Sequence, residues 1–244
     1  MAREGRAVNF CSIFSFIRQN PVYAAAMPRG KENEVYQLKV TLKGTKPPVW
    51  RRVLVPADVP LDRLHDVLQV VMRWTDSHLH QFVTRSKAKR PSREDWAAAL
   101  QGITHTGELD VDAVYGERRY SNPEFGLETA YDERKFRLSE VAPAVGSKVT
   151  YEYDFGDSWE HEVLVEKILP PDASAHAPVC VTGKRNCPPE DCGGAWGYAQ
   201  LLDALKNPRH ERHKELLEWL GDDFDPEHFN IDEVNAALRQ FSGR

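Results

Sequence analysis

The strongest constraint on the fold is a hairpin pattern between residues 149 and 169. Val149, Tyr151, Tyr153 and Phe155 alternate with polar residues, and apolar residues alternate again from Trp159 to Leu169. A period of two places every second side chain on one face of a strand. Gly156-Asp157-Ser158, between the two segments, is typical of a tight turn. We therefore expect two adjacent antiparallel strands with one buried face.

Similar patterns predict the elements before this hairpin. Residues 36–42 and 49–55 alternate around Gly44 and Pro47-Pro48, which indicates a second hairpin with a longer loop. Apolar residues at helical spacing predict a helix over about 61–74, and a short strand is expected at about 79–84. The expected fold class is α+β, with a roll-type mixed or antiparallel sheet, one packed helix and a helical C-terminal tail.

Three helices are expected near the C-terminus. The first carries an apolar face over 198–205, the second opens at Asn207-Pro208 and ends near Gly221, and the third starts at Asn230 with a capping-box pattern.

The chain has 244 residues and 41% hydrophobic content, enough to bury one core. We expect residues 1–33 to form a disordered extension, 34–205 an α+β domain with an insertion at about 86–108, and 206–244 helices packed on the same domain. The first segment partly mimics an export signal, but its apolar part is short. A cytoplasmic location is therefore expected, and either Met1 or Met27 is the true start.

The charge balance argues against a general attraction to nucleic acid or to membranes. The net charge is -5, with a pI near 6.0, so no global positive field is present. No stretch approaches the roughly 20 apolar residues of a membrane span, and no membrane partner is expected. Local phosphate contacts could still come from Arg51, Arg52 and the run Lys87–Arg93.

His78 and His80 are the first candidate site residues. On a strand they would point to the same face, about 7 Å apart. Two such imidazoles can ligate a metal or move protons. The alternative is a surface pair, or one buried, hydrogen-bonded histidine.

A second candidate lies around the predicted turn. Asp154 and Asp157 flank the turn, and His161 follows on the buried face of the next strand. An Asp–His pair is one interpretation. The other is structural, because Asp beside Gly stabilises turns and a buried His is usually hydrogen-bonded.

A third candidate is the acidic pair Glu190 and Asp191. Pro188-Pro189 precede the pair and Gly193-Gly194 follow it, just before a predicted helix. Such a loop can form a rigid ligand site. The helix dipole alone would also stabilise these carboxylates.

The cysteines offer a fourth candidate. Cys180, Cys187 and Cys192 are spaced more loosely than in zinc ribbons, but His161 or His176 could complete a four-ligand zinc site with them. The alternative is a set of small buried thiols.

Several motifs in order resemble the ORF-three-like family of the Ri plasmid pRiA, also described as insertion-element passenger, TnpR-like. They are Tyr36-Gln37-Leu38-Lys39-Val40, Pro48-Val49-Trp50-Arg51-Arg52, Leu64-His65, Trp74, His78-Leu79-His80-Gln81-Phe82, Asp132-Glu133-Arg134, Tyr151 to His161, Cys187-Pro188-Pro189-Glu190-Asp191 with Gly193-Gly194, and Phe224-Asp225-Pro226-Glu227. The resemblance implies an α+β roll. It implies an association with plasmids and mobile elements in bacteria but no particular activity, and the chain has no serine among arginines of the kind that a serine recombinase needs.

Three functional hypotheses remain open at this point. The first is a non-enzymatic binding module for a protein or nucleic acid. The second is a metal-dependent hydrolase or nuclease-like enzyme that holds a divalent ion such as zinc with His80, Asp154, Asp157, His161, Glu190 and Asp191. The third is a purely structural role, in which Asp154, His161 and Glu190 form a buried hydrogen-bond network that specifies the fold. The second requires the turn after Tyr153 and the loop after Cys187 to lie together.

Overall fold

The computed structural model describes residues 34–85, 116–170, 178–221 and 224–242. The extension expected at 1–33 and the insertion expected at 86–108 lie outside these residues. Within the described residues, no helix combines the length and apolar character of a membrane span.

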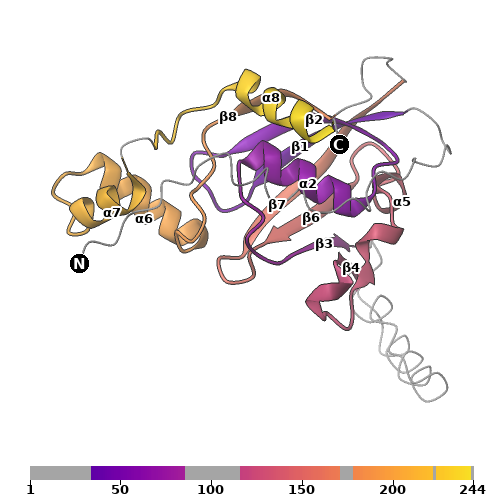
Figure 1. Ribbon diagram of the computed structural model, residues 1–244, viewed down its shortest axis with the longest axis horizontal. Coiled ribbons are helices and arrows are strands. Elements are labelled where there is room, and N and C mark those ends of the chain that lie inside the picture. The colour runs from indigo at the N-terminus through magenta and orange to yellow at the C-terminus, as the bar shows by residue number, and fades with distance from the viewer. Residues whose placement is uncertain (1–33, 86–115, 171–177, 222–223, 243–244) are drawn as a thin grey trace.

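In the described part of the chain, the centre of the molecule is one eight-stranded sheet with the order β5-β4-β3-β6-β7-β1-β2-β8 (Figure 1). The strands are β1 (Val35–Leu42), β2 (Trp50–Pro56), β3 (His80–Arg85), β4 (Glu117–Ser121), β5 (Tyr131–Asp132), β6 (Lys148–Tyr153), β7 (Trp159–Leu169) and β8 (Val179–Lys184). β4 and β5 are parallel, and all other neighbours are antiparallel. The sheet is therefore mixed, which confirms the α+β class.

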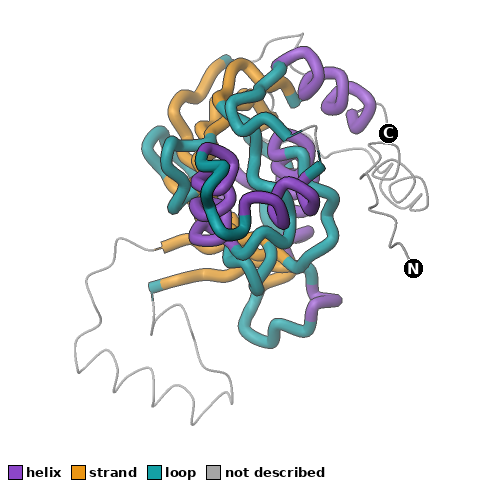
Figure 2. The backbone as a smooth tube through the Cα atoms, turned by 90° about the vertical axis from the view of Figure 1, so that its left-hand side faces the viewer, coloured by secondary structure: helices purple, strands orange, loops and turns teal. Residues whose placement is uncertain are grey.

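Helices pack on this sheet and beside it. They are α2 (Leu61–Met72), the single turn α5 (Leu138–Val141), α6 (Gly194–Lys206), α7 (His213–Leu220) and α8 (Ile231–Ser242), with 3-10 turns η2 (Pro123–Phe125) and η3 (Glu133–Lys135). α2 lies across the sheet, and α8 contacts both α2 and β8 (Figure 1). Figure 2 looks from the end that carries α6 and α7, with the strands behind these two helices.

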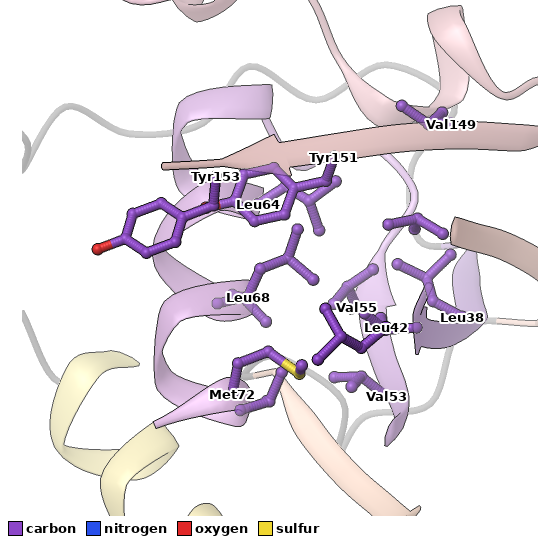
Figure 3. Packing of buried hydrophobic residues seen from close by; sticks show 14 of the residues in the cluster. Leu38, Leu42, Val53, Val55, Leu64, Leu68, Met72, Val149, Tyr151 and Tyr153 are labelled. Carbon is purple, nitrogen blue, oxygen red and sulfur yellow. The ribbon is translucent and has the colours of Figure 1, made fainter. Parts of the chain in front are cut away.

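The core forms where the buried face of the sheet meets α2. Every second residue of β1, β2 and β6, and of β7 as far as Val165, is buried, as the alternation requires. Figure 3 shows the contact between α2 and the sheet through Leu64, Leu68, Met72, Val53, Val55, Tyr151 and Tyr153. Burial of each large apolar side chain contributes about 1.5–3 kcal/mol, so this face holds the elements of the site in place.

One predicted helix start is wrong. Asn207 ends α6 and does not open the next helix, because its Oδ1 accepts the backbone N–H of Arg209 in a turn and α7 begins only at His213. Gly221 ends α7 as expected, with φ of 75°. Asn230 caps α8 by accepting the N–H groups of Asp232 and Glu233.

The phosphate contacts expected from Arg51 and Arg52 are not available in this structure. Arg51 lies on the buried face of β2, where it is 0% exposed and donates to the carbonyls of Val71 and Lys184 at 2.9 and 3.0 Å. Val71 is in the last turn of α2, where a cation is favourable. Arg52 points the other way and is paired with Glu166 at 2.6 Å. Both guanidinium groups therefore have internal partners.

Candidate metal centre

Three chain segments meet at the end of the sheet nearest α6. They are the link 73–79 between α2 and β3, the turn 154–158 between β6 and β7, and the loop 185–193 before α6. The link meets the turn through the Asp154 N–H, which donates to the carbonyl of Leu79 at 2.8 Å. The loop meets the turn through the Gly193 N–H, which donates to Asp157 Oδ2 at 3.0 Å. The turn after Tyr153 and the loop after Cys187 therefore lie together.

The three segments place one histidine and two aspartates within ligand distance of each other. His78 Nε2 lies 3.7 Å from Asp154 Oδ2 and 3.4 Å from Asp191 Oδ1. The nearest ligand atoms of all three residues lie within 4.8 Å of one another. His78 Nε2 is buried and makes no hydrogen bond within the described part of the chain. We call His78, Asp154 and Asp191 the His78 cluster.

The His78 cluster is closed on one side and open on the other. The side chain of Asp154 is 10% exposed, that of His78 26%, and that of Asp191 74%. The ring of His78 is edge-on to Tyr153, with centroids 5.7 Å apart. The sheet therefore supports the cluster from below, and solvent reaches it past Asp191.

Asp154 combines the two roles that the sequence left as alternatives. Its Oδ1 accepts the N–H groups of Gly156 and Asp157 at 2.9 and 3.3 Å, which stabilises the turn. Its Oδ2 faces His78. Both Asp154 and Asp191 have positive φ, 58° and 61°, a conformation that Asp adopts more readily than most residues.

Glu190 and Asp157 hold the segments together and do not belong to the His78 cluster. Glu190 accepts hydrogen bonds from the backbone and hydroxyl of Thr75, and from the Tyr153 hydroxyl at 2.6 Å. Burial raises the pKa of Tyr153 well above its usual value, and the bond to Glu190 raises it further. The phenol therefore stays protonated and donates.

His80 lies in a different place from His78, so the two do not share a strand face. β3 begins only at His80. The His80 ring stacks on His65 with centroids 3.5 Å apart, and its Nε2 lies 2.9 Å from Glu133 Oε2. His65, Asp76 and Glu133 were not among the residues that the sequence singled out as candidates. The one sequence signal for His65 and Glu133 is that both lie in motifs that resemble the plasmid family.

His65, Asp76 and His80 also place ligand-type atoms within 4.8 Å of each other, but their geometry does not suit a metal ion. An imidazole lone pair lies in the plane of its ring, and metal–nitrogen bonds are about 2.0–2.1 Å long. Two rings stacked 3.5 Å apart at 7° cannot both direct lone pairs at one ion.

The hydrogen bonds around His65 instead form a chain. Gln69 Nε2 donates to the Tyr151 hydroxyl at 2.8 Å, the hydroxyl lies 2.8 Å from His65 Nδ1, and His65 Nε2 lies 2.9 Å from Asp76 Oδ1. Burial lowers the pKa of His65, so the ring is neutral and accepts from Tyr151 while donating to Asp76. This chain links α2 to β6, but its residues are not the Asp154, His161 and Glu190 that the structural hypothesis placed in one network.

His161 lies in the core, away from the His78 cluster. It is 0% exposed, its Nδ1 lies 3.2 Å from the carbonyl of Tyr151, and its ring is edge-on to Trp74. Burial lowers the pKa of His161 to about 4. It is a neutral core residue.

The proposed zinc set of Cys180, Cys187, Cys192 and His161 does not come together, and the alternative ligand His176 lies outside the described residues. Among the described residues, neither group with metal-ligand spacing contains a cysteine. Cys187 is buried against Arg51 and Met72, and Cys180 is buried in β8. Burial raises the pKa of Cys180 to about 11 and that of Cys192 to about 12. These are free, protonated thiols.

Comparison with known proteins gives consistent matches over most of the chain. A family model described as plasmid pRiA4b ORF-3-like protein matches residues 34–233. The chain is 37% identical over 211 residues to an uncharacterized protein, y4hQ, of Sinorhizobium fredii (strain NGR234), covering 86% of this chain and 93% of that protein. It is also similar to the crystal structure of a protein of unknown function from Methanosarcina mazei Go1, with 35% identity, a TM-score of 0.65, and coverage of 82% of this chain and 97% of that chain. These descriptions name no activity. The chain belongs to the plasmid pRiA4b ORF-3-like protein family.

Proposed function

We propose that the protein is a divalent-metal-dependent hydrolase whose ion binds in the His78 cluster. One observation carries the proposal: the buried Nε2 of His78 makes no hydrogen bond and faces two carboxylate oxygens. A buried nitrogen without a hydrogen bond is costly unless an ion or a charged group binds it. A divalent ion would bind the nitrogen and offset the repulsion between the two carboxylates.

The spacing of the cluster supports an ion. Bonds of about 2.0–2.1 Å at tetrahedral angles place ligand atoms about 3.3–3.4 Å apart. His78 Nε2 lies 3.4 Å from Asp191 Oδ1 and 3.7 Å from Asp154 Oδ2, so small side-chain movements would complete the geometry. One imidazole and two carboxylates suit zinc, manganese or a similar ion better than a soft metal.

The number of ligands and the exposure of Asp191 support catalysis over a purely structural ion. Structural zinc sites are closed by four protein ligands, whereas catalytic sites use three and leave a position for water or substrate. The His78 cluster offers three side chains and is open past Asp191. An ion held there would supply a metal-bound water at neutral pH.

The competing hypothesis, a non-enzymatic binding module for a protein or nucleic acid, has less support. Of the basic residues that suggested phosphate contacts, Arg51 and Arg52 have internal partners, and Lys87–Arg93 lies outside the described residues. We also infer a cytoplasmic location, which the free thiols of Cys180, Cys187 and Cys192 support.

The test measures metal binding by the protein after a chelator has removed bound metal and dialysis has removed the chelator. Isothermal titration with Zn²⁺, Mn²⁺ and Mg²⁺ should show one ion per chain for at least one metal. Asp191→Asn should weaken that binding at least about tenfold, equal to about 1.4 kcal/mol, without lowering the metal-free melting temperature. Asp203→Asn, at an exposed position on α6, is the matched control and should bind as wild type.

A hydrolysis assay then tests the enzyme class. The metal-loaded protein should cleave generic p-nitrophenyl phosphate or carboxylate esters, and Asp191→Asn should lose that activity. If none of the three metals binds at one ion per chain, the proposal is wrong. If the protein binds the metal but cleaves neither ester class, the hydrolase assignment is wrong and the protein is a metal-dependent binding module.

A further inference from the structure

We infer that the hydroxyl group of Tyr153 is the positioning group of the metal centre. The inference rests on the proposed function and adds to it a residue that does not touch the ion. The three residues of the His78 cluster come from three segments. The residues that precede them in the sequence are Ser77, Tyr153 and Glu190, and these three are joined by hydrogen bonds at the Tyr153 hydroxyl oxygen.

The convergence is direct. The Ser77 N–H donates to the Tyr153 hydroxyl oxygen at 2.9 Å, and the hydroxyl donates to Glu190 Oε1 at 2.6 Å. His78 follows Ser77, Asp154 follows Tyr153, and Asp191 follows Glu190. Each ligand residue therefore directly follows a residue that is held at the Tyr153 hydroxyl oxygen.

The phenol oxygen is itself held firmly. The Tyr153 side chain is 0% exposed and belongs to β6, the strand between β3 and β7. Its ring stacks on Trp74, with centroids 5.1 Å and planes 21° apart. The indole N–H of Trp74 in turn donates to the carbonyl of Pro188 at 2.9 Å, which ties the loop 185–193 to the same stack.

The exposed ligand depends most on this support. The Asp191 carboxylate is 74% exposed and lies 3.4 Å from His78 Nε2. Its position is fixed through Glu190, which binds Tyr153 and Thr75. Removal of groups that orient metal ligands typically costs about 10–100-fold in metal affinity.

Tyr151 offers a matched control on the same strand. It is also 0% exposed, and its hydroxyl bonds His65 and Gln69, not the residues next to the ligands. Tyr→Phe at either position removes one buried hydroxyl and keeps the ring. Both variants should lose similar stability, so a difference in metal affinity reports positioning.

The test compares the metal dissociation constants of Tyr153→Phe and Tyr151→Phe by titration against a competing chelator, with the metal that wild type binds. We expect a loss of about 10–100-fold for Tyr153→Phe and less than about threefold for Tyr151→Phe. Equal affinities, or a larger loss for Tyr151→Phe, would overturn the inference.

A second variant covers the case in which Tyr153→Phe fails to fold. Glu190→Gln keeps an acceptor for one donor and loses the carboxylate that binds both Tyr153 and Thr75, so an intermediate loss of affinity is expected; wild-type affinity would count against the inference. If wild type binds no ion, both the proposed function and this inference fail. If Asp191→Asn weakens binding but Tyr153→Phe does not, only the positioning role fails.

Discussion

The imidazole rings of His65 and His80 lie face to face, with centroids 3.5 Å apart and planes 7° apart. Both are buried and each has a carboxylate partner, Asp76 for His65 and Glu133 for His80. Burial lowers the pKa of His65, and the neighbouring His80 lowers it further, while Asp76 acts in the opposite direction. The folded protein therefore disfavours a charge on His65 that the unfolded chain accepts freely.

Acid should destabilise the protein through its buried histidines. The pKa of His161 is about 4 in the folded protein and 6.5 in the unfolded chain. Between pH 4 and pH 6.5 the unfolded state therefore binds more protons than the folded state. The stability that depends on neutral His161 is present above pH 6.5 and is lost as the pH falls toward 4. At pH 5 the loss from this residue is about 2 kcal/mol; His65 acts in the same direction.

Urea unfolding of wild type and His161→Gln at pH 7 and pH 5 checks this prediction. Asp66 opposes the histidines, because burial raises its pKa to about 7, so wild type alone is not informative. The pH-dependent loss should be smaller by about 2 kcal/mol in the variant. Parallel pH profiles for the two proteins would contradict the assignment.

Asn235 should protect the open edge of the sheet. β8 is the last strand on its side, and the Asn235 amide accepts the Cys180 N–H at 2.8 Å and donates to the Cys180 carbonyl at 2.9 Å. Asn235→Ala removes both bonds and should cost about 1–3 kcal/mol. The freed edge should also promote self-association. Urea unfolding and light scattering measure these effects, with Gln240→Ala, exposed on the same helix, as control.

Arg51 should be far more sensitive to substitution than its neighbour. A lysine cannot reproduce its bonds to Val71, Lys184 and Trp50. Arg51→Lys should therefore lower the free energy of unfolding by about 2–4 kcal/mol. Arg52→Lys alters a partly exposed ion pair with Glu166 and should cost less than about 1 kcal/mol. Similar losses for the two variants would show that the buried bonds contribute little.

Gly194 should be required for the contact between turn and loop. Its φ is 66°, and a Cβ there would collide with the backbone carbonyl oxygen of Asp157. Gly194→Ala should cost about 2–4 kcal/mol and weaken metal binding, because the loop moves away from Asp154. Gly126→Ala has similar φ, 69°, but open space around it, and should cost about 1 kcal/mol without affecting metal binding. Thermal unfolding and metal titration distinguish the two.

The sequence predicted those parts of the fold that are set by local patterns. Both hairpins and α2 follow from alternation or helical spacing over six residues or more, and each buries one face. β5 has two residues, Tyr131–Asp132, too few for a pattern. The start of α7 was misplaced because Asn207-Pro208 has the composition of both a helix cap and a turn.

The site was predicted only in part, for a related reason. Loop composition drew attention to Asp154, Glu190 and Asp191, and these segments do meet. The separation of His78 from His80 depends on where β3 starts, which alternation locates only to within a residue or two. The partnership of His80 with His65 and Glu133 joins positions 15 and 53 residues away, and no local pattern encodes it.

The turn that carries Asp154 has a consequence for the energetics of ion binding. Two backbone N–H groups donate hydrogen bonds to Oδ1 of Asp154. Folding alone therefore orients Oδ2 toward His78. An ion that arrives finds this ligand preorganised, so little of the binding free energy is spent on freezing side-chain rotation. Variants at Gly156 or Asp157 could thus change affinity for the ion from positions that never touch it.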